Sequence, residues 1–564
     1  MLYIARTMYV DDLTYSRKGK TYRRVLLRHS YREGGKTRQR NLANLSHCSE
    51  EEILAVKFAL KNKNNIDFLR QISHAKTQNW KIAGPSVLLH QVTNHLGINK
   101  ALGREAESNY ILWQVFARLI HPGSRLGNIR LARSHCGCEL LGISSITEND
   151  LYKSLVWLHD RKGHVEDRLF RQTIGNKPGM PTLFLYDVSS SYFEGQHNEL
   201  ASYGYNRDKK KGKKQLVYGL LTDDNGEPLS IEAFRGNTRD PDTLKTQIEK
   251  IKDKYDCQSV AIVGDKGMIK STQIKDIQQS GLNYITTITK PQIEALINKG
   301  IFQLELFTDE LAEVTDQAER VRYILRRNPL RAEEIKLSRQ SKFQSIEHKL
   351  EQSNRYLAEH PRAKAEVQKK VVTNYIKKLK MDKLAEVRTV KDKRELEIYK
   401  NESALEEAAM LDGCYVIKTD LVHSPGDKKE EVHSRYKSLA LVEWAFRTEK
   451  SQLGIRPIFL RKEHRTKAHL MVCMLAYKIE KYLRECWKDM DVTVEEGIEK
   501  LCSIVGMKTE LAPGKQVIWL PEPDELNRQL LSRANVTLPT YLPTNETIVS
   551  TNEKLTKHRK WHTV

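Results

Sequence analysis

The sequence of 564 residues predicts an α/β fold built on a mixed sheet that an insertion interrupts. Short apolar runs, typical of buried strands, alternate with helical patterns from residue 181 onward and resume at residue 411. A highly charged stretch separates the two parts. Apolar residues make up 39% of the chain and charged residues 29%, which is the balance of a globular protein with a sizeable core.

The order of the predicted elements specifies the sheet further. We expect strands at Leu183–Val188, Gln215–Thr222, Pro228–Phe234, Ser259–Asp265 and Asn283–Thr289, with helices at Asp242–Tyr255 and Ser271–Ser280. The turn Asp223–Glu227 predicts a hairpin between the second and third strands. Three strands in succession, followed by alternating helices and strands, predict a ribonuclease-H-like mixed sheet. Its first three strands meander and its later strands run parallel to the first.

The segments around this sheet have their own patterns. Between Asp11 and Arg40 the chain is basic and alternates at a strand period, and Ser49 precedes acidic residues as the N-cap of a helix does. Residues 85–175 read as helices that either bind DNA or serve as scaffold. Two apolar stripes in the insertion predict a helical hairpin, and a strand Cys414–Thr419 precedes helices at about 434–453 and 465–487.

Charge and cysteine content limit the class of protein. Lys and Arg number 94 against 72 Asp and Glu, and this excess favours a polyanionic partner, nucleic acid before anionic membrane. The most apolar stretches, Ile111–Ile120 and Leu470–Ile479, are too short to span a bilayer. No secretory signal is visible in Met1–Asp12. Mostly solitary cysteines suit a reducing cytosol, and the cluster at 135–138 lacks a second pair of zinc ligands.

Two acidic residues stand at the ends of predicted buried strands. Asp187 ends the first strand and Asp265 the fourth, and those strands neighbour each other in the predicted order. A single such acid is usually a turn or cap residue. Two of them, a few ångströms apart, disfavour joint ionisation unless cations lie between them.

The predicted helix at about 434–453 carries a third acid with basic neighbours. Glu443, Arg447 and Lys450 share one face, with Tyr436 two turns earlier. The bulky residues Leu441, Trp444, Ala445, Phe446 and Leu453 predict that much of this helix is buried. An exposed ion pair between Glu443 and Arg447 is the ordinary alternative for this spacing.

A basic loop joins the first two strands of the predicted sheet. Its six cations are Arg207, Lys209, Lys210, Lys211, Lys213 and Lys214. A charge run of this kind is often a solvated loop, but beside a site for phosphodiester chemistry it is equally suited to phosphate contact.

Together these motifs resemble the bacterial insertion-sequence transposases of the DDE type, which have a ribonuclease-H-like catalytic core and a Y-R-E-K signature. The segments that carry the resemblance are Tyr186–Tyr192, Gly264–Met268 and Tyr436–Lys450, with Ile455–Ile458 beyond them. The resemblance extends from Met1 to about Trp487. One position departs from the signature, because Leu439 stands where its arginine is expected.

The resemblance implies an enzyme that binds terminal inverted repeats, cleaves DNA at element ends and joins 3′ ends to target DNA. Asp187, Asp265 and Glu443 would hold two Mg²⁺ ions, for which Mn²⁺ can substitute. Arg447, Lys450 and the basic loop would contact DNA phosphates. Tyr436 would either stack on a displaced nucleotide or pack in the core.

The resemblance also implies double-stranded DNA as partner, a homodimer in the DNA complex, no membrane, and a cytoplasmic, nucleoid-associated location. The alternative is a catalytically silent DNA-binding protein derived from a transposase. The expected regions are a basic strand and helix domain at 1–80, a helical domain at 81–178, the catalytic core at 179–299 and 411–490, a strand-plus-helix insertion at 300–410, and a C-terminal region with a loose tail at 491–564.

Overall fold

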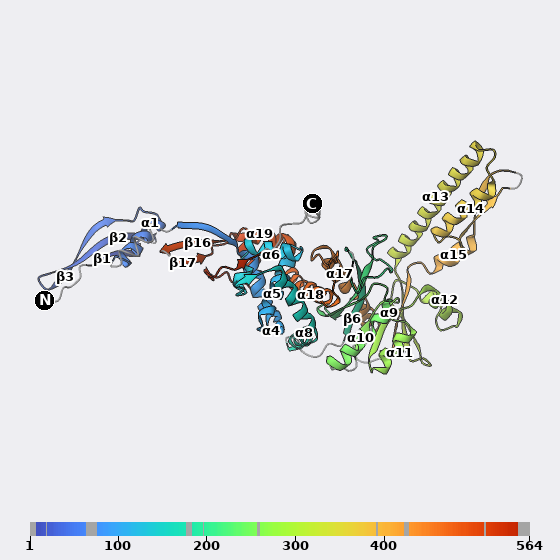
Figure 1. The fold of residues 1–564 in the computed structure, drawn as a ribbon, viewed down its shortest axis with the longest axis horizontal. Coiled ribbons are helices and arrows are strands. Elements are labelled where there is room, and N and C mark those ends of the chain that lie inside the picture. The colour runs from blue at the N-terminus through green and yellow to red at the C-terminus, as the bar shows by residue number, and fades with distance from the viewer. Residues whose placement is uncertain are drawn as a thin grey trace. The chain divides into compact units, whose positions relative to one another are not determined.

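The computed structural model describes residues 7–17, 20–63, 76–175, 183–195, 197–255, 260–390, 393–421, 428–512 and 515–550. The chain forms two compact units. One comprises 1–88, 132–145 and 497–548, and the other 89–131, 146–496 and 549–564. Figure 1 labels the elements of both.

The first unit contains two antiparallel sheets. Strands β1 (Thr7–Arg17), β2 (Lys20–Glu33) and β3 (Lys36–Asn44) form one, followed by helix α1 (Glu50–Lys61). Ser49 caps α1 in a complete capping box with Glu52, which confirms the predicted helix start. Strands β4 (Lys76–Ile82), β16 (Val505–Ala512), β17 (Lys515–Trp519) and β18 (Tyr541–Leu542) form the other, with α7 (Gly137–Leu140) and α20 (Glu525–Arg533) in the same unit.

Helices of the second unit form a buried layer. Its members are α4 (Ile98–Leu102), α5 (Ala106–Ile120), α8 (Glu148–Gly175) and α18 (Glu463–Trp487). The predicted helix at 465–487 is thus present, but Ala468–Glu480 is buried on every side because α5, α8 and β8 surround it. None of the helices in the described ranges has the length and apolar character needed to cross a membrane.

Eight described strands of the second unit form one mixed sheet in the order β11-β12-β15-β10-β9-β6-β7-β8. Strands β6 (Leu183–Tyr192), β7 (Gln215–Asp223) and β8 (Pro228–Arg235) form an antiparallel meander, while β9 (Ala261–Val263) and β10 (Asn283–Thr287) run parallel to β6. All five predicted strands are therefore present in the predicted directions. The hairpin is also present, because the carboxylate of Asp223 accepts the amides of Asn225 and Glu227.

The two faces of this sheet pack against different helices. Tyr186 and Val188 of β6 lie in a core cluster with residues of α10 (Lys245–Glu249), η1 (Lys250–Lys254) and α11 (Ser271–Gln279). The predicted helix at 242–255 is not continuous. It consists of three short helices, α9 (Asp240–Thr243), α10 and η1. On the other face, the ring of Tyr218 meets Phe446 of α17 (Ala440–Ser451) edge-on at 5.4 Å.

The insertion extends the sheet and adds a helical arm. Strand β12 (Val321–Arg327) pairs with β15 (Cys414–Thr419), and β11 (Ala312–Asp316) pairs with β12. The predicted bounds of β15 are confirmed. Helices α13 (Pro329–Glu359) and α14 (Ala365–Lys378) lie side by side and extend away from the sheet (Figure 1). Both predicted stripes pack in one cluster, which also includes the unforeseen hairpin of β13 (Ala385–Thr389) and β14 (Leu396–Lys400). The insertion also holds α15 (Glu402–Met410), and α12 (Lys290–Asn298) precedes it.

A buried ionic network joins α8 to the sheet. Glu166 is 1% exposed, and its carboxylate accepts Lys162, Lys250 and the hydroxyl of Ser230 within 3.0 Å. Glu232 of β8 pairs with both lysines, and these cations hold its pKa at about 2 despite its burial. Two anions and two cations in low dielectric are stable only as a complete set.

Removing one member of this network should strongly destabilise the second unit. We expect Glu166→Ala to lower the free energy of unfolding by about 3–5 kcal/mol, because two lysines would remain buried with half their counter-charge. Glu407→Ala, on the exposed face of α15, should change it by less than about 0.5 kcal/mol. Denaturant unfolding measures both, and equal effects would contradict the assigned network.

Candidate catalytic site

Parallel pairing brings the first two acids near each other, but the expectation that Asp187 ends its strand is wrong, because β6 continues to Tyr192 and Asp187 lies in its middle. Leu185 of β6 lies opposite Val263 of β9, so continuing this register by two residues sets Asp187 beside Asp265. Since Tyr186 and Val188 face the helices α10 and α11, Asp187 faces the opposite side, toward α17. Asp265 accepts the amides of Gly267 and Met268 at 2.9 Å, which holds its carboxylate in the turn after β9.

The segment that carries the third acid is two helices. The continuous helix predicted at 434–453 is wrong, because α16 (Lys429–Lys437) ends and α17 begins only at Ala440. Leu439 lies in the turn between them and is buried, so its side chain packs in the interior at the position of the signature arginine. The hydroxyl of Tyr436 lies 3.1 Å from that of Thr287, which is at the end of β10.

The negative charges of the other two acids act on Asp187. Burial raises the pKa of Asp187 to about 7, and the negative charges of Asp265 and Glu443 raise it as well. Burial also raises the pKa of Tyr436, and the charges of Asp265 and Glu443 add to this effect. Within the described ranges, however, no three His, Cys, Asp or Glu side chains lie together closely enough to form a ready-made set of metal ligands.

Glu443 is on the exposed stripe of α17, and its side chain forms no ion pair or hydrogen bond with any described residue. The alternative of a Glu443–Arg447 pair is therefore not realised. The Arg447 guanidinium lies 5.4 Å from the centre of the Trp444 ring instead. Trp444 is 45% exposed and Leu441 38% exposed, so the expectation that they are buried is wrong, whereas Ala445, Phe446 and Leu453 are buried as expected. A stripe of Glu443, Trp444 and Arg447 thus remains open to a ligand.

Sequence reasoning missed one carboxylate in this region. Asp208, in the middle of the basic loop, is 1% exposed at its side chain. It accepts Lys450 at 3.0 Å and Arg456 at 2.6 Å, and its second oxygen accepts the amide of Tyr192. A single acid within a run of cations is the signal that could have revealed it. Asp208 ties the loop to the end of α17, and Lys450 is a partner of that carboxylate.

The basic loop divides into paired and unpaired cations. Arg207 pairs with Asp240 at 2.6 Å, and its charge lowers the pKa of Asp187. Lys213 pairs with Glu194, while Lys210 and Lys214 lie over aromatic rings at 5.8 Å. Lys209 adopts a positive φ of 56° in the turn, and Lys211 is exposed. The loop therefore is a folded element beside Asp187 with its outer lysines in solvent.

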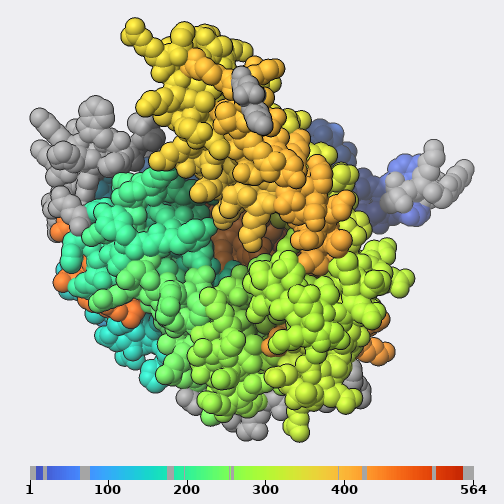
Figure 2. Space-filling view, turned by 90° about the vertical axis from the view of Figure 1, so that its right-hand side faces the viewer, coloured from blue at the N-terminus to red at the C-terminus, as the bar shows by residue number. Residues whose placement is uncertain are grey.

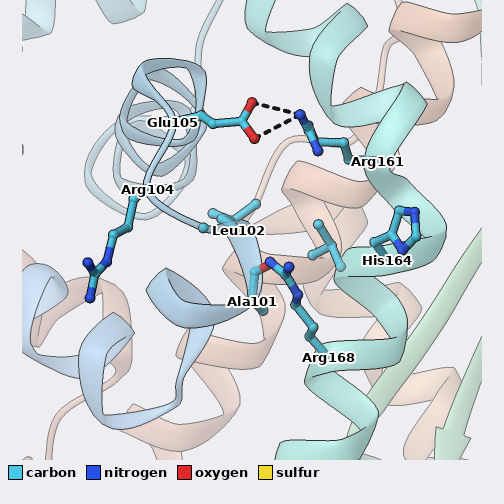
Figure 3. Close-up of a pocket in the computed structure, with 9 residues that line it drawn as sticks. Ala101, Leu102, Arg104, Glu105, Arg161, His164 and Arg168 are labelled. Atoms are coloured by element: carbon cyan, nitrogen blue, oxygen red, sulfur yellow. Dashed lines mark hydrogen bonds and ion pairs between the residues drawn. The ribbon is translucent and has the colours of Figure 1, made fainter.

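The surface around these elements is hollowed. In the space-filling view, a hollow opens between the green segments of the sheet region and the orange segment of the insertion, and darker orange atoms of later residues lie at its bottom (Figure 2). A separate pocket of about 290 Å³ lies between α4, the start of α5 and α8. Arg104, Arg161, His164 and Arg168 line it, with Glu105 held by Arg161 at 2.8 Å (Figure 3). None of the predicted site residues lines that pocket.

Comparison with protein families decides the assignment. Residues 178–479, more than half of the chain, match the family described as "Transposase DDE domain". This chain belongs to the DDE transposases. Residues 13–69 match "IS1634 family transposase, N-terminal domain", so the transposase is of the insertion-sequence type. Membership in these families implies an enzyme that cuts and joins DNA.

Two further comparisons add little to this. No curated protein matches the transposase. A cryo-EM structure of a piggyBac transposase synaptic complex with hairpin DNA is similar at 9% identity and a TM-score of 0.33, over 80% of this chain and 77% of that one. So low a score supports no argument about this chain.

Beside Lys450, helix α17 contains a buried acid without a partner. Glu449 is fully buried, its carboxyl oxygens accept no hydrogen bond from the described residues, and burial raises its pKa to about 8. The folded state therefore binds a proton that the unfolded chain releases near pH 4.5. Stability from this group falls as pH rises from there toward 8.

We expect Glu449→Gln to remove this pH dependence. Between pH 6 and 8 the wild-type transposase should lose up to about 3 kcal/mol more stability than the variant, since each pKa unit corresponds to about 1.4 kcal/mol. Thermal or denaturant unfolding at both pH values measures the difference. Glu407→Gln is the matched control, and parallel pH profiles for Glu449→Gln and wild type would contradict the buried neutral acid.

Proposed function

We propose that this transposase binds the terminal inverted repeats of its element, cleaves DNA at the element ends and joins the 3′ ends to target DNA. The observation that carries the proposal is the placement of three acids from separate segments of the chain: β6, which carries Asp187, pairs with β9, which leads to Asp265, and packs against α17, which carries Glu443. Such a cluster of carboxylates is unfavourable by itself. A phosphodiester-cleaving site that recruits cations accounts for it.

Divalent metal ions suit this donor set. Asp187, Asp265 and Glu443 offer hard carboxylate oxygens, the ligands that Mg²⁺ prefers and that Mn²⁺ also accepts. The exposed carboxylate of Glu443 has no described protein partner to displace. When bound, two Mg²⁺ ions would activate the attacking oxygen and stabilise the leaving oxygen.

The remaining site residues fit roles in holding DNA. Arg447 projects from the exposed stripe next to Glu443, where its guanidinium can pair with a phosphate bidentately. Arg207 and the outer lysines of the loop would neutralise phosphate charge beside Asp187. Lys450 would act by holding the loop through Asp208, and Tyr436 by fixing the start of this segment against β10.

The strand order supports a ribonuclease-H-like core. The meander β8-β7-β6 followed by the parallel strands β9 and β10 has the predicted order, with Asp187 in the middle of β6 and Asp265 in the turn after β9. We extend the proposal to the six regions predicted from the sequence, to a cytoplasmic, nucleoid-associated location and to a homodimer that holds two DNA ends. Dimerisation would give each end one set of acids.

A silent DNA-binding derivative is the second candidate function. Leu439 favours it, because a buried leucine at the signature position removes one cationic contact to DNA. The three acids favour an active enzyme, since a protein that only binds DNA has no need for coupled carboxylates at one edge of its sheet.

Metal-dependent cleavage separates these candidates. With duplex DNA that carries the element ends, we expect nicking in Mg²⁺ and none in EDTA. Asp187→Ala, Asp265→Ala and Glu443→Ala should each lower the cleavage rate by about 10³-fold or more, because each removes ligands for the charged centre. Binding to the same DNA should persist.

The matched control is Asp224→Ala, which removes an exposed acid from the turn between β7 and β8. Its cleavage rate should equal that of wild type. Full-rate cleavage by any of the three site variants would exclude that residue, and DNA binding without cleavage by wild type would favour the silent derivative.

A further inference from the structure

The N-terminal sheet of the first unit ends in a ribbon with no core of its own. We define the basic ribbon as residues 28–41, the far halves of β2 and β3 with their connecting turn. The described pairing of β1 with β2 reaches Ser30, so residues 28–30 lie in the three-stranded part of the sheet, and beyond Ser30 the described pairing of β2 is with β3. Every residue from Arg32 to Asn44 is exposed. A two-stranded hairpin without buried side chains gains little stability in water, so packing does not explain its length.

The turn of the ribbon has the geometry of a tight hairpin. Gly34 and Gly35 both have positive φ, at 59° and 81°, which other residues rarely adopt. A side chain at either position would meet nothing within 4 Å. The glycines therefore serve the backbone turn and leave a narrow, unobstructed tip.

The charges of the ribbon are mostly unpaired. Arg28 pairs with Asp11 at 2.8 Å and Arg38 with Glu33 at 3.1 Å. Arg32, Lys36 and Arg40 make no ion pair with any described residue. In the strand register, Arg32 lies opposite Thr37 and Arg40 opposite His29, so these two arginines are on opposite faces of the ribbon.

The part of the same sheet next to α1 differs from the ribbon in its ion pairs and in its buried side chains. There Asp12 accepts both Arg23 and Lys57, and Arg23 also pairs with Glu50. Val25 and Ile53 are buried nearby. The chain thus supplies counter-ions where the sheet packs against its helix and omits them along the ribbon.

We propose that the basic ribbon inserts into the major groove of duplex DNA, as the part of the first unit that grips the element end; this rests on the proposed function for the DNA's identity. The major groove, about 12 Å wide, admits a two-stranded ribbon. Phosphates line the groove on both sides, which suits cations on both faces. A lipid surface fits poorly, since Leu42 is the one large apolar side chain exposed between Arg32 and Asn44.

The test is DNA binding by the full chain with Arg32→Ala and Arg40→Ala combined. Fluorescence anisotropy in EDTA, with duplexes carrying the element end or a random sequence, gives Kd over a series of salt concentrations. We expect binding at 0.1 M salt to weaken by about tenfold or more. The slope of log K against log salt should fall by about two, because each lost phosphate contact removes about 0.9.

Two variants keep this test decisive. Arg331→Ala with Lys336→Ala removes the same charge from the exposed side of α13 and should leave Kd and slope unchanged. Arg32→Lys combined with Arg40→Lys keeps the charge, so this lysine pair should bind the random duplex as wild type does. Unchanged Kd and slope in the alanine pair, or no recovery in the lysine pair, would overturn the proposal.

The outcome is separable from that of the proposed function. Wild type that binds DNA through the ribbon but never cleaves it would end the catalytic proposal alone. Wild type that cleaves DNA while the alanine pair binds normally would end the ribbon proposal alone. If the alanine pair lost binding to another protein but still bound duplex DNA as wild type does, the ribbon would not be a DNA contact.

Discussion

The parallel pairing of β6 with β9 is the constraint on which the candidate site depends. It aligns Asp187 with the end of β9, and the turn that follows, in which Asp265 accepts the amides of Gly267 and Met268, holds the second carboxylate. Two carboxylates held this way repel each other, and burial adds to the cost by raising the pKa of Asp187 to about 7. The core cluster beneath β6 holds the strand in place through buried apolar side chains, and positive charge at the site would offset the repulsion.

Glu443 is positioned by a different kind of contact. Helix α17 packs on the sheet through Phe446 and Tyr218, and polar contacts fix its end, where Asp208 binds Lys450 and Arg456. Arg118 of α5 donates to the carbonyl of Gly454 just beyond. These contacts fix the buried side of α17 and leave the Glu443 carboxylate without a partner among the described side chains. Because its buried side is fixed to the sheet, α17 can hold Glu443 in a defined position toward a ligand.

The sequence was informative where one force dominated. Short apolar runs predicted the strands β6 to β10 and β15, because both faces of a fully buried strand need apolar side chains. The break between α16 and α17 escaped prediction, since Ser438 and Leu439 are both compatible with a helix and tertiary packing decides the turn. The exposure of Trp444 escaped it for the opposite reason: bulk usually indicates burial, and only the cations beside the ring reveal another use.

Charge is distributed in this protein according to burial. In the interior, Glu166 and Asp208 each meet two cations, so the positive charge there has carboxylate partners and holds elements together. On the basic ribbon and along the outer loop, arginines and lysines face solvent with few acids nearby. An excess of 22 positive charges destabilises a compact chain through self-repulsion unless a polyanion offsets it. Under the proposed function, nucleic acid bound at the surfaces with unpaired cations would relieve this repulsion, and the same electrostatic term would supply affinity for DNA.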